Sequence, residues 1–156
     1  MGLPRKYILP NVPMYSKKLS VSEKENRNKN YGSPYHETLR VLLEEKLSEE
    51  LYVNWHAMKS KGYQMNIDSG KKCPDFVVSD QNGETSCRDV RELIIKSLTE
   101  KGYEEGINYP YKGAELIKRY GEPSKGCNAI QMEINRQLYL DETSVSKNNG
   151  FSVFER

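Results

Sequence analysis

The chain has 156 residues, which is enough for one domain with one hydrophobic core. Hydrophobic residues make up 36% and charged residues 29%, and the net charge is only +2, so charge gives no argument for a nucleic-acid or membrane-surface partner. No stretch approaches the roughly 20 apolar residues of a membrane span. No signal peptide is visible, and the three cysteines form no paired motif, so we expect a reduced, cytoplasmic protein.

The N-terminal part is predicted to be a poorly ordered segment over residues 1–30, followed by a single α/β domain over 31–156. Prolines interrupt any periodicity near the start, and the charged run from Lys17 to Lys29 predicts a solvated loop. A basic arm for nucleic acid is the alternative, but Glu23 and Glu25 dilute its charge.

An amphipathic helix is predicted from Pro34 to Leu51. Ser33 is a favourable N-cap, and proline is favoured at the first helical position. Leucines then recur at spacings of three and four, which places them on one face. His36 falls in the first turn, either as a hydrogen-bonded residue of the helix start or as a metal ligand.

The segment LYVNWHAM at 51–58 alternates along its length and predicts a strand. Tyr52, Asn54 and His56 share one face of it. A histidine near a strand end, before an irregular loop, is either a hydrogen-bonded, partly buried side chain or a metal ligand. The residue pattern alone leaves both interpretations of His56 open.

Four further elements are predicted between residues 76 and 120. Ser86 and Asp89 have the spacing of a capping box at the start of a helix, and Gly102 is placed to end that helix after Lys101. Asn108 follows a short strand and either contacts a substrate or holds the turn before Pro110. The elements are a strand at Phe76–Val78, a helix at Ser86–Lys101, a short strand ending at Ile107, and a helix at Ala114–Tyr120.

The stretch GCNAIQMEINRQLYLDE at 126–142 begins as an alternating strand and is predicted to turn into a helix near Arg136. A glutamate such as Glu133 is costly to bury near the end of a core strand unless something uses it. Ligands of open α/β sheets bind beyond the carboxyl ends of strands, where Glu133 is expected. Arg136 either holds a substrate carboxylate through two hydrogen bonds or forms a salt bridge at the helix start.

Six segments resemble, in order, the motifs of the N-formylglutamate amidohydrolase family: YGSPYHETL, NWHAMKS, PDFVVSDQNGETS, GYEEGINYPYKG, RYGEP and QMEINRQLYLDE. The resemblance runs from Tyr31 to Glu142 and corresponds to the middle and C-terminal part of a longer enzyme. It implies a truncated zinc-carboxypeptidase-like α/β fold, with a mixed sheet of about four strands flanked by helices. The family reaction releases formate and glutamate from N-formylglutamate, late in histidine breakdown.

The resemblance also implies roles for particular residues. His56 matches a zinc ligand, and Glu133 matches the carboxylate that moves a proton from water to the leaving nitrogen. Arg136 and Asn108 are the expected substrate contacts. Four positions depart from the family pattern, which has Asp at Asn54, Ser at Ala57, Gly at Ser79 and often His at Asn128.

The number of metal ligands is too small for the expected zinc site. Such a site needs three protein ligands, the chain has two histidines, and the family's first ligands lie N-terminal to the matched portion. Pairing His56 with His36, Asp68 or Asp80 gives no recognised spacing. We therefore expect a chain that is weak or inactive on its own.

Three functions are open at this point. The first is zinc-dependent hydrolysis of a small-molecule N-acyl amino acid, and the second is an inactive remnant of the fold that acts as a binding module. The third, a small nucleic-acid-binding protein, rests only on the Lys-rich segment. A missing segment would leave a sheet edge open, so we expect a homo-oligomer or a complementing upstream fragment as partner.

Overall fold

A computed structural model describes residues 17–45, 51–62 and 70–154 of the chain. The chain divides into two compact units, Met1–Ser48 and Glu49–Arg156. The predicted division into a poorly ordered segment over 1–30 and a domain over 31–156 stays a prediction. No helix in the described ranges is long and apolar enough to cross a membrane.

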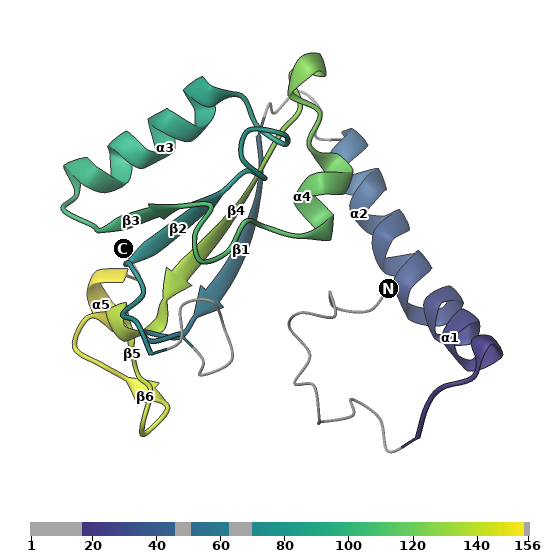
Figure 1. Ribbon diagram of the computed structural model, residues 1–156, viewed down its shortest axis with the longest axis horizontal. Coiled ribbons are helices and arrows are strands. Elements are labelled where there is room, and N and C mark those ends of the chain that lie inside the picture. Colours follow the sequence, from purple (N-terminus) through teal and green to yellow (C-terminus); the bar gives the residue numbers. More distant parts are fainter. Residues whose placement is uncertain (1–16, 46–50, 63–69, 155–156) are drawn as a thin grey trace. The chain divides into compact units, whose positions relative to one another are not determined.

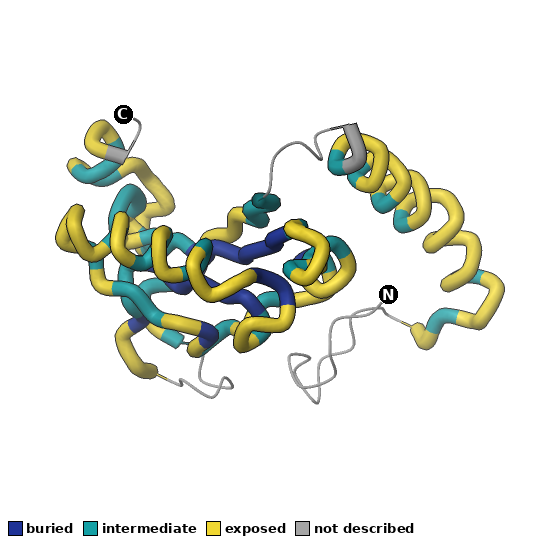
Figure 2. Tube along the Cα trace, turned by 90° about the horizontal axis from the view of Figure 1, so that it is seen from above, coloured by how far each residue is buried: buried dark blue, intermediate teal, exposed yellow. Residues whose placement is uncertain are grey.

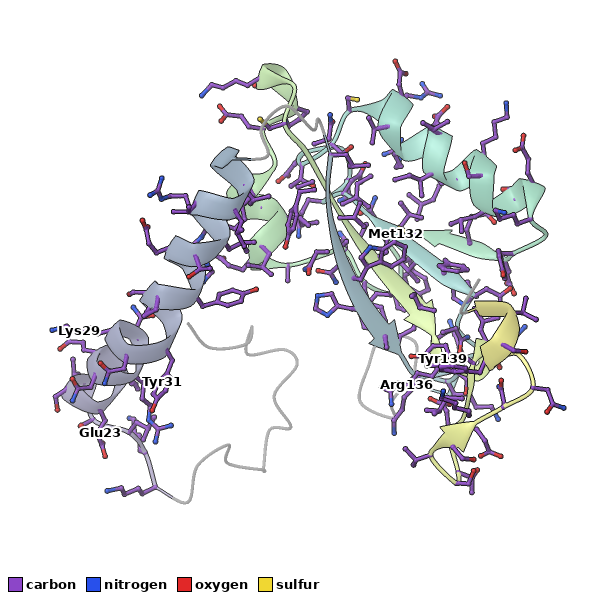
Figure 3. The ribbon with its side chains drawn as sticks, turned by 180° about the vertical axis from the view of Figure 1, so that it is seen from behind. Glu23, Lys29, Tyr31, Met132, Arg136 and Tyr139 are labelled. Atoms are coloured by element: carbon purple, nitrogen blue, oxygen red, sulfur yellow. The ribbon has the colours of Figure 1, made fainter. Side chains whose placement is uncertain are left out.

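The first unit is helical. Helix α1 (Val21–Arg27) is followed by a π-helical turn, η2 (Asn28–Gly32), and by α2 (Ser33–Glu45). Figure 3 shows Glu23, Lys29 and Tyr31 on the first two of these elements. The loop predicted over Lys17–Lys29 is therefore wrong from Val21 onward.

A capping box explains this helix in a strongly charged segment. The Ser20 hydroxyl accepts from the Glu23 backbone N–H, and the Glu23 side chain accepts from the Ser20 backbone N–H. Two N–H groups that would lack partners at the helix start are satisfied in this way.

Helix α2 continues η2 without a break, and Ser33 is itself helical, with its N–H donating to Asn28 O, so its predicted role as the N-cap before Pro34 is wrong. The predicted end of this helix at Leu51 is also wrong, because Leu51 already belongs to a strand.

The second unit is built on a four-stranded mixed sheet, as predicted (Figure 1). Its strand order is β1-β4-β2-β3. Strands β1 and β4 are parallel, β2 and β3 are parallel, and β2 is antiparallel to β4. The strands are β1 (Leu51–Met58), β2 (Phe76–Ser79), β3 (Glu105–Ile107) and β4 (Asn128–Asn135).

One face of the sheet is apolar and carries α3 (Arg88–Glu100). Phe76, Val78, Ile130 and Met132 form its buried core, because alternate residues of a strand share a face. The dark-blue segments of Figure 2 mark the buried parts of the chain. From α3, the apolar stripe packed against this core consists of Val90, Ile94, Ile95 and Leu98.

The opposite face of the sheet is polar along β4, where Gln131, Glu133 and Asn135 are buried, whereas His56 on β1 is exposed. Helix α4 (Glu115–Tyr120) packs on this face near the start of β1, where the Tyr120 ring meets the Tyr52 ring edge to face at 6.2 Å between ring centroids. Ile117 of α4 is fully buried. The second half of the polar face is the part that carries His56 and Glu133.

The starts and ends of several elements differ from the capping chemistry expected of the sequence. The N-cap of α3 is Cys87, not Ser86, and it makes no side-chain cap bond. The Ser86 hydroxyl donates instead to Asn128 Oδ1 at 3.3 Å, which ties this turn to β4. Gly102 does follow the helix with a φ of 80°, as predicted for a glycine that ends a helix.

The C-terminal part consists of short elements after β4. The helix predicted from Arg136 is a single 3-10 turn, η4 (Arg136–Leu138). Another 3-10 turn, η3 (Pro123–Lys125), precedes β4. The remaining elements are β5 (Leu140–Asp141), β6 (Ser146–Lys147) and α5 (Phe151–Phe154), with β5 and β6 forming an antiparallel pair.

Two glycines with positive φ make a matched test of this packing. Gly102→Ala places a Cβ in open space and should cost about 1 kcal/mol of unfolding free energy from backbone strain alone. Gly113→Ala has the same kind of backbone, with φ of 83°, but its Cβ would overlap the Ile117 side chain. We expect an additional loss of about 1–3 kcal/mol in urea unfolding. Equal losses for the two variants would contradict the tight packing of Gly113 on α4.

Candidate active site

Four polar side chains lie together on the second half of the polar face. In the parallel pairing of β1 with β4, His56 is opposite Glu133 and Asn54 is opposite Gln131. Because side chains alternate along a strand, all four project from the same face. The register therefore brings together His56 and Glu133, two of the residues singled out from the sequence.

Glu133 is buried, with 7% of its surface exposed. Its Oε1 accepts a hydrogen bond from Gln131 Nε2 at 2.9 Å. Burial raises the pKa of Glu133 above its usual value, while the charge of His56, the Gln131 bond and the charge of Arg136 act in the opposite direction. The result is a carboxyl group with one oxygen fixed by Gln131 and an increased tendency to hold a proton.

His56 is exposed and is oriented by its own strand. Asn54 Nδ2 lies 2.9 Å from His56 Nε2. When the amide donates this bond, Nε2 is the acceptor and the ring proton sits on Nδ1. Asn54 thus keeps a contact with the imidazole, but it brings no negative charge to it.

Arg136 is positioned by the residue before it. Asn135 is fully buried, and its amide nitrogen donates to Cys73 O at 3.1 Å and to Pro74 O at 3.0 Å. Its side-chain oxygen accepts from the Gln137 backbone N–H and so caps the turn η4. Figure 3 shows Arg136 where β4 ends, close to Tyr139. Arg136 therefore lies at the same end of the sheet as Glu133.

Asn108 lies elsewhere, because β2 runs antiparallel to β4 and β3 is parallel to β2. The residues that follow β2 and β3 are therefore at the end of the sheet opposite to Arg136. Asn108 is 8% exposed; its oxygen accepts from Asp80 N at 3.0 Å, and its nitrogen donates to Asp80 Oδ1 at 2.7 Å. In this structure its amide holds the turn after β2, and its role as a substrate contact stays a prediction.

The loop after Asn108 returns along the polar face toward the site. The Ser79 hydroxyl donates to Tyr111 O at 2.8 Å. The Tyr111 side chain packs on a buried cluster that includes Met58 and Val77, and Val77 lies opposite Glu133 in the sheet. Tyr111 thus packs on a cluster that contains the sheet neighbour of Glu133. The alternation of β4 contained the signal for Gln131, which shares the parity of Glu133.

The described residues do not provide a zinc site of three protein ligands. Across residues 17–45, 51–62 and 70–154, no three His, Cys, Asp or Glu side chains are grouped so that they could hold a metal ion. Asp80 is fully buried and salt-bridged to Arg91 at 2.8 Å, at the opposite end of the sheet, while Asp68 lies outside the described residues. A metal at His56 needs further ligands from beyond these ranges.

Comparison with known proteins gives a consistent result. The family model described as "N-formylglutamate amidohydrolase" matches residues 1–140. The match therefore begins well before Tyr31, where the motifs of the sequence suggested that it starts. A crystal structure of N-formylglutamate amidohydrolase from Ralstonia eutropha JMP134 superimposes with a TM-score of 0.79 and 35% identity, covering 92% of this chain and 53% of that chain.

Two curated relatives are called N-formylglutamate deformylase. The Pseudomonas putida protein is 28% identical over 147 residues, which cover 91% of this chain and 54% of the relative. The Pseudomonas aeruginosa protein is 25% identical over 146 residues, which cover 90% and 54%. The chain thus spans about half the length of the curated relatives that it matches.

The raised pKa of Glu133 predicts how stability depends on pH. The folded state binds this proton more tightly than the unfolded state, which titrates near 4.5, so the stabilisation is present below that pH and is lost as pH rises through the folded pKa. Glu133→Gln keeps an acceptor for Gln131 and cannot ionise. Urea unfolding should show the variant gaining stability relative to the wild type from pH 4 to pH 7.

Glu92→Gln is the matched control for this measurement. The hydrogen bond from Arg88 lowers the pKa of Glu92, so the stabilisation by its ionised form is complete above the unfolded value of 4.5 and is lost only as pH falls further. The free energy of unfolding of Glu92→Gln should therefore run parallel to that of the wild type from about pH 5 to pH 7. If the stability of Glu133→Gln stays parallel to that of the wild type at every pH, burial does not control the Glu133 proton.

Proposed function

The chain belongs to the N-formylglutamate amidohydrolase family, and we propose that it hydrolyses the amide bond of an N-formyl or other N-acyl amino acid, releasing formate or the corresponding acid. The observation that carries this proposal is the pairing of His56 with Glu133 across two parallel strands, with Arg136 at the same end of the sheet. Glu133 can accept a proton, His56 can bind a metal ion and Arg136 can bind a carboxylate. This hydrolysis requires all three.

Glu133 is the proposed proton carrier. Its raised pKa brings the carboxyl group closer to neutral pH, where general acid–base catalysis is most efficient. Gln131 holds Oε1, so Oε2 is the oxygen available to take a proton from water and pass it to the leaving nitrogen. Burial keeps competing water away from this carboxyl group.

Arg136 is the proposed contact for the substrate carboxylate. A guanidinium group can bind a carboxylate through two parallel hydrogen bonds, which fixes orientation as well as charge. Arg136 follows Glu133 by three residues and acts electrostatically on its pKa. A substrate carboxylate held at Arg136 would therefore bring its amide group near Glu133.

His56 is the residue that we propose as a zinc ligand, and the zinc-carboxypeptidase-like class of fold is part of the same proposal. One imidazole does not make a zinc site, because such sites use three protein ligands and leave one position open. The other ligands would have to come from outside the described residues.

A second candidate function is favoured by the small number of grouped metal ligands in the described residues. A chain without three grouped ligands in its described ranges could serve as a binding module that retains the family fold without catalysis. The two functions differ in a measurable property, because only the first requires that zinc binds at His56.

Zinc content separates these two functions. The purified protein should bind one zinc ion per chain, and His56→Ala should abolish that binding because the imidazole is lost. The chain has only one other histidine, so His36→Ala is the matched control and should retain the metal. Absence of zinc from both the wild type and the His36 variant would reject the amidohydrolase in favour of the binding module.

Hydrolysis of N-formylglutamate by the zinc-loaded chain tests the roles of the two charged residues. Glu133→Gln should lower kcat by about 10²–10⁴-fold, the usual contribution of a positioned acid–base group. Arg136→Ala should mainly raise KM, by roughly 10- to 150-fold, because a bond to a charged group contributes about 1.5–3 kcal/mol. Arg88→Ala, at an exposed arginine of α3, is the control and should change neither constant. An unchanged kcat for Glu133→Gln would exclude the proposed proton carrier.

A further inference from the structure

One carboxylate joins the C-terminal hairpin, formed by β5 and β6, to the end of β1. Glu142 follows β5 directly, and Ser60 lies two residues after Met58, the last residue of β1. The Glu142 Oε2 atom accepts a hydrogen bond from the Ser60 backbone N–H at 3.1 Å and another from the Ser60 hydroxyl. Glu142 therefore connects the segment after β4 to the segment after β1, across 82 positions of the chain.

Ser60 continues this connection toward the candidate active site. The Cys73 backbone N–H donates to Ser60 O at 2.9 Å, and Cys73 O accepts from the Asn135 amide nitrogen at 3.1 Å. Asn135 caps the turn η4, which begins with Arg136. From η4 the chain runs through β5 back to Glu142. The turn that carries Arg136 is thus held on both sides, by Asn135 before it and by Glu142 after it.

The carboxylate of Glu142 serves this one contact. Its Oε1 atom is buried and has no hydrogen-bond partner among the described residues, whereas both bonds to Oε2 come from Ser60. Glutamine has the same shape and can present an oxygen to Ser60 in the same place. The contact can therefore be kept or removed without changing the rest of the hairpin.

We propose that Glu142 is a positioning residue of the active site, which holds Ser60 and thereby keeps η4 in the orientation in which Arg136 binds the substrate carboxylate. The inference rests on the proposed function of Arg136. Strands β1 and β4 pair over all eight of their residues, whereas η4 is a three-residue 3-10 turn and a two-stranded hairpin is only marginally stable by itself. The hairpin is therefore the part that moves when the bonds of Glu142 are lost, and Arg136 moves with it.

A displaced Arg136 is expected to weaken substrate binding and to leave the chemical step unchanged. The carboxylate that it binds does not react, so the contact is the same in the ground state and in the transition state. Glu133 keeps its place, because it belongs to β4 and not to the hairpin. The effect cannot exceed that of removing Arg136 itself, so Glu142→Ala should raise KM by about 10-fold with an unchanged kcat.

Three further variants test this effect on the zinc-loaded chain with N-formylglutamate. Glu142→Gln keeps the acceptor for Ser60 and should restore KM to within roughly twofold of the wild type. Ser60→Ala keeps the backbone bond alone and should give an intermediate KM. Asp141→Ala is the matched control, because the Asp141 carboxylate accepts from the backbone N–H groups of Thr143 and Ser144 within the hairpin. Its KM should equal that of the wild type.

Amide hydrogen exchange gives a second readout that requires no turnover. The Tyr139 backbone N–H donates to Arg136 O at 3.0 Å and so closes η4. In Glu142→Ala this amide should exchange about 10-fold faster, because the turn opens more often once the hairpin is released. Its exchange rate should be unchanged in Glu142→Gln and in Asp141→Ala.

Several results would overturn the inference. A wild-type KM in Glu142→Ala, or an unchanged exchange rate of the Tyr139 amide, excludes the positioning role. A KM that stays high in Glu142→Gln while the exchange rate is restored means that the charge of Glu142 contacts the substrate directly. A lower kcat with an unchanged KM in Glu142→Ala assigns Glu142 to the chemical step.

The Arg136→Ala variant separates a failure of this inference from a failure of the proposed function. If Arg136→Ala raises KM and Glu142→Ala does not, only the inference is wrong. If neither variant changes KM, the proposed role of Arg136 is wrong as well. A wild-type chain that does not hydrolyse N-formylglutamate contradicts the proposed function, and the same comparison is then made on the Kd of N-formylglutamate by titration calorimetry.

Discussion

His56 and Glu133 lie side by side because β1 and β4 pair in parallel over all eight of their residues. A shift of one residue would turn the whole polar row of β1 to the apolar face, so the position of each site group depends on this one register. The apolar face enforces it, since Ile130 and Met132 of β4 are buried in the core with residues of β2. Packing on the apolar face of the sheet thereby determines which side chains lie next to each other on the polar face.

Buried polar groups shape the far end of the sheet. Asp80 is fully buried, and it accepts from Arg91, from the Asn108 amide and from the Gly83 backbone N–H. A buried carboxylate is tolerated only when its oxygens are satisfied in this way. The network holds the turns after β2 and β3 together, and the loop from Asn108 then continues to Tyr111, which packs on the cluster of Met58 and Val77. Order at one end of the sheet therefore positions a side chain near the other.

The elements with strong periodicity could be predicted from the sequence, and their relations in space could not. The alternation in 51–58 and around Ile130 identified two strands, yet nothing in either strand says that they pair in parallel. The family motifs led to Glu133, His56 and Arg136, and the alternation of β4 already contained Gln131. The differences come from local chemistry. The charge near Lys24 predicts a loop, but the capping box of Ser20 and Glu23 starts a helix there. Ser86 has the spacing of a cap, but its hydroxyl donates to Asn128 instead. The sequence predicts that Asn108 follows a short strand, but only the antiparallel direction of β2 shows at which end of the sheet it lies.

The pairing of β1 with β4 also has a consequence for synthesis of the chain. Paired residues of the two strands are 77 positions apart in the chain, as in Leu51 and Asn128, and β4 is the only sheet neighbour of β1 in the described structure. At about 5–20 residues per second, a ribosome needs about 4–15 s to make β4 after β1 has been completed. During that interval the edge of β1 that later pairs with β4 is open, and contacts between distant segments form slowly even afterwards. The nascent chain is therefore most vulnerable to association with other unfinished chains before its last 30 residues emerge.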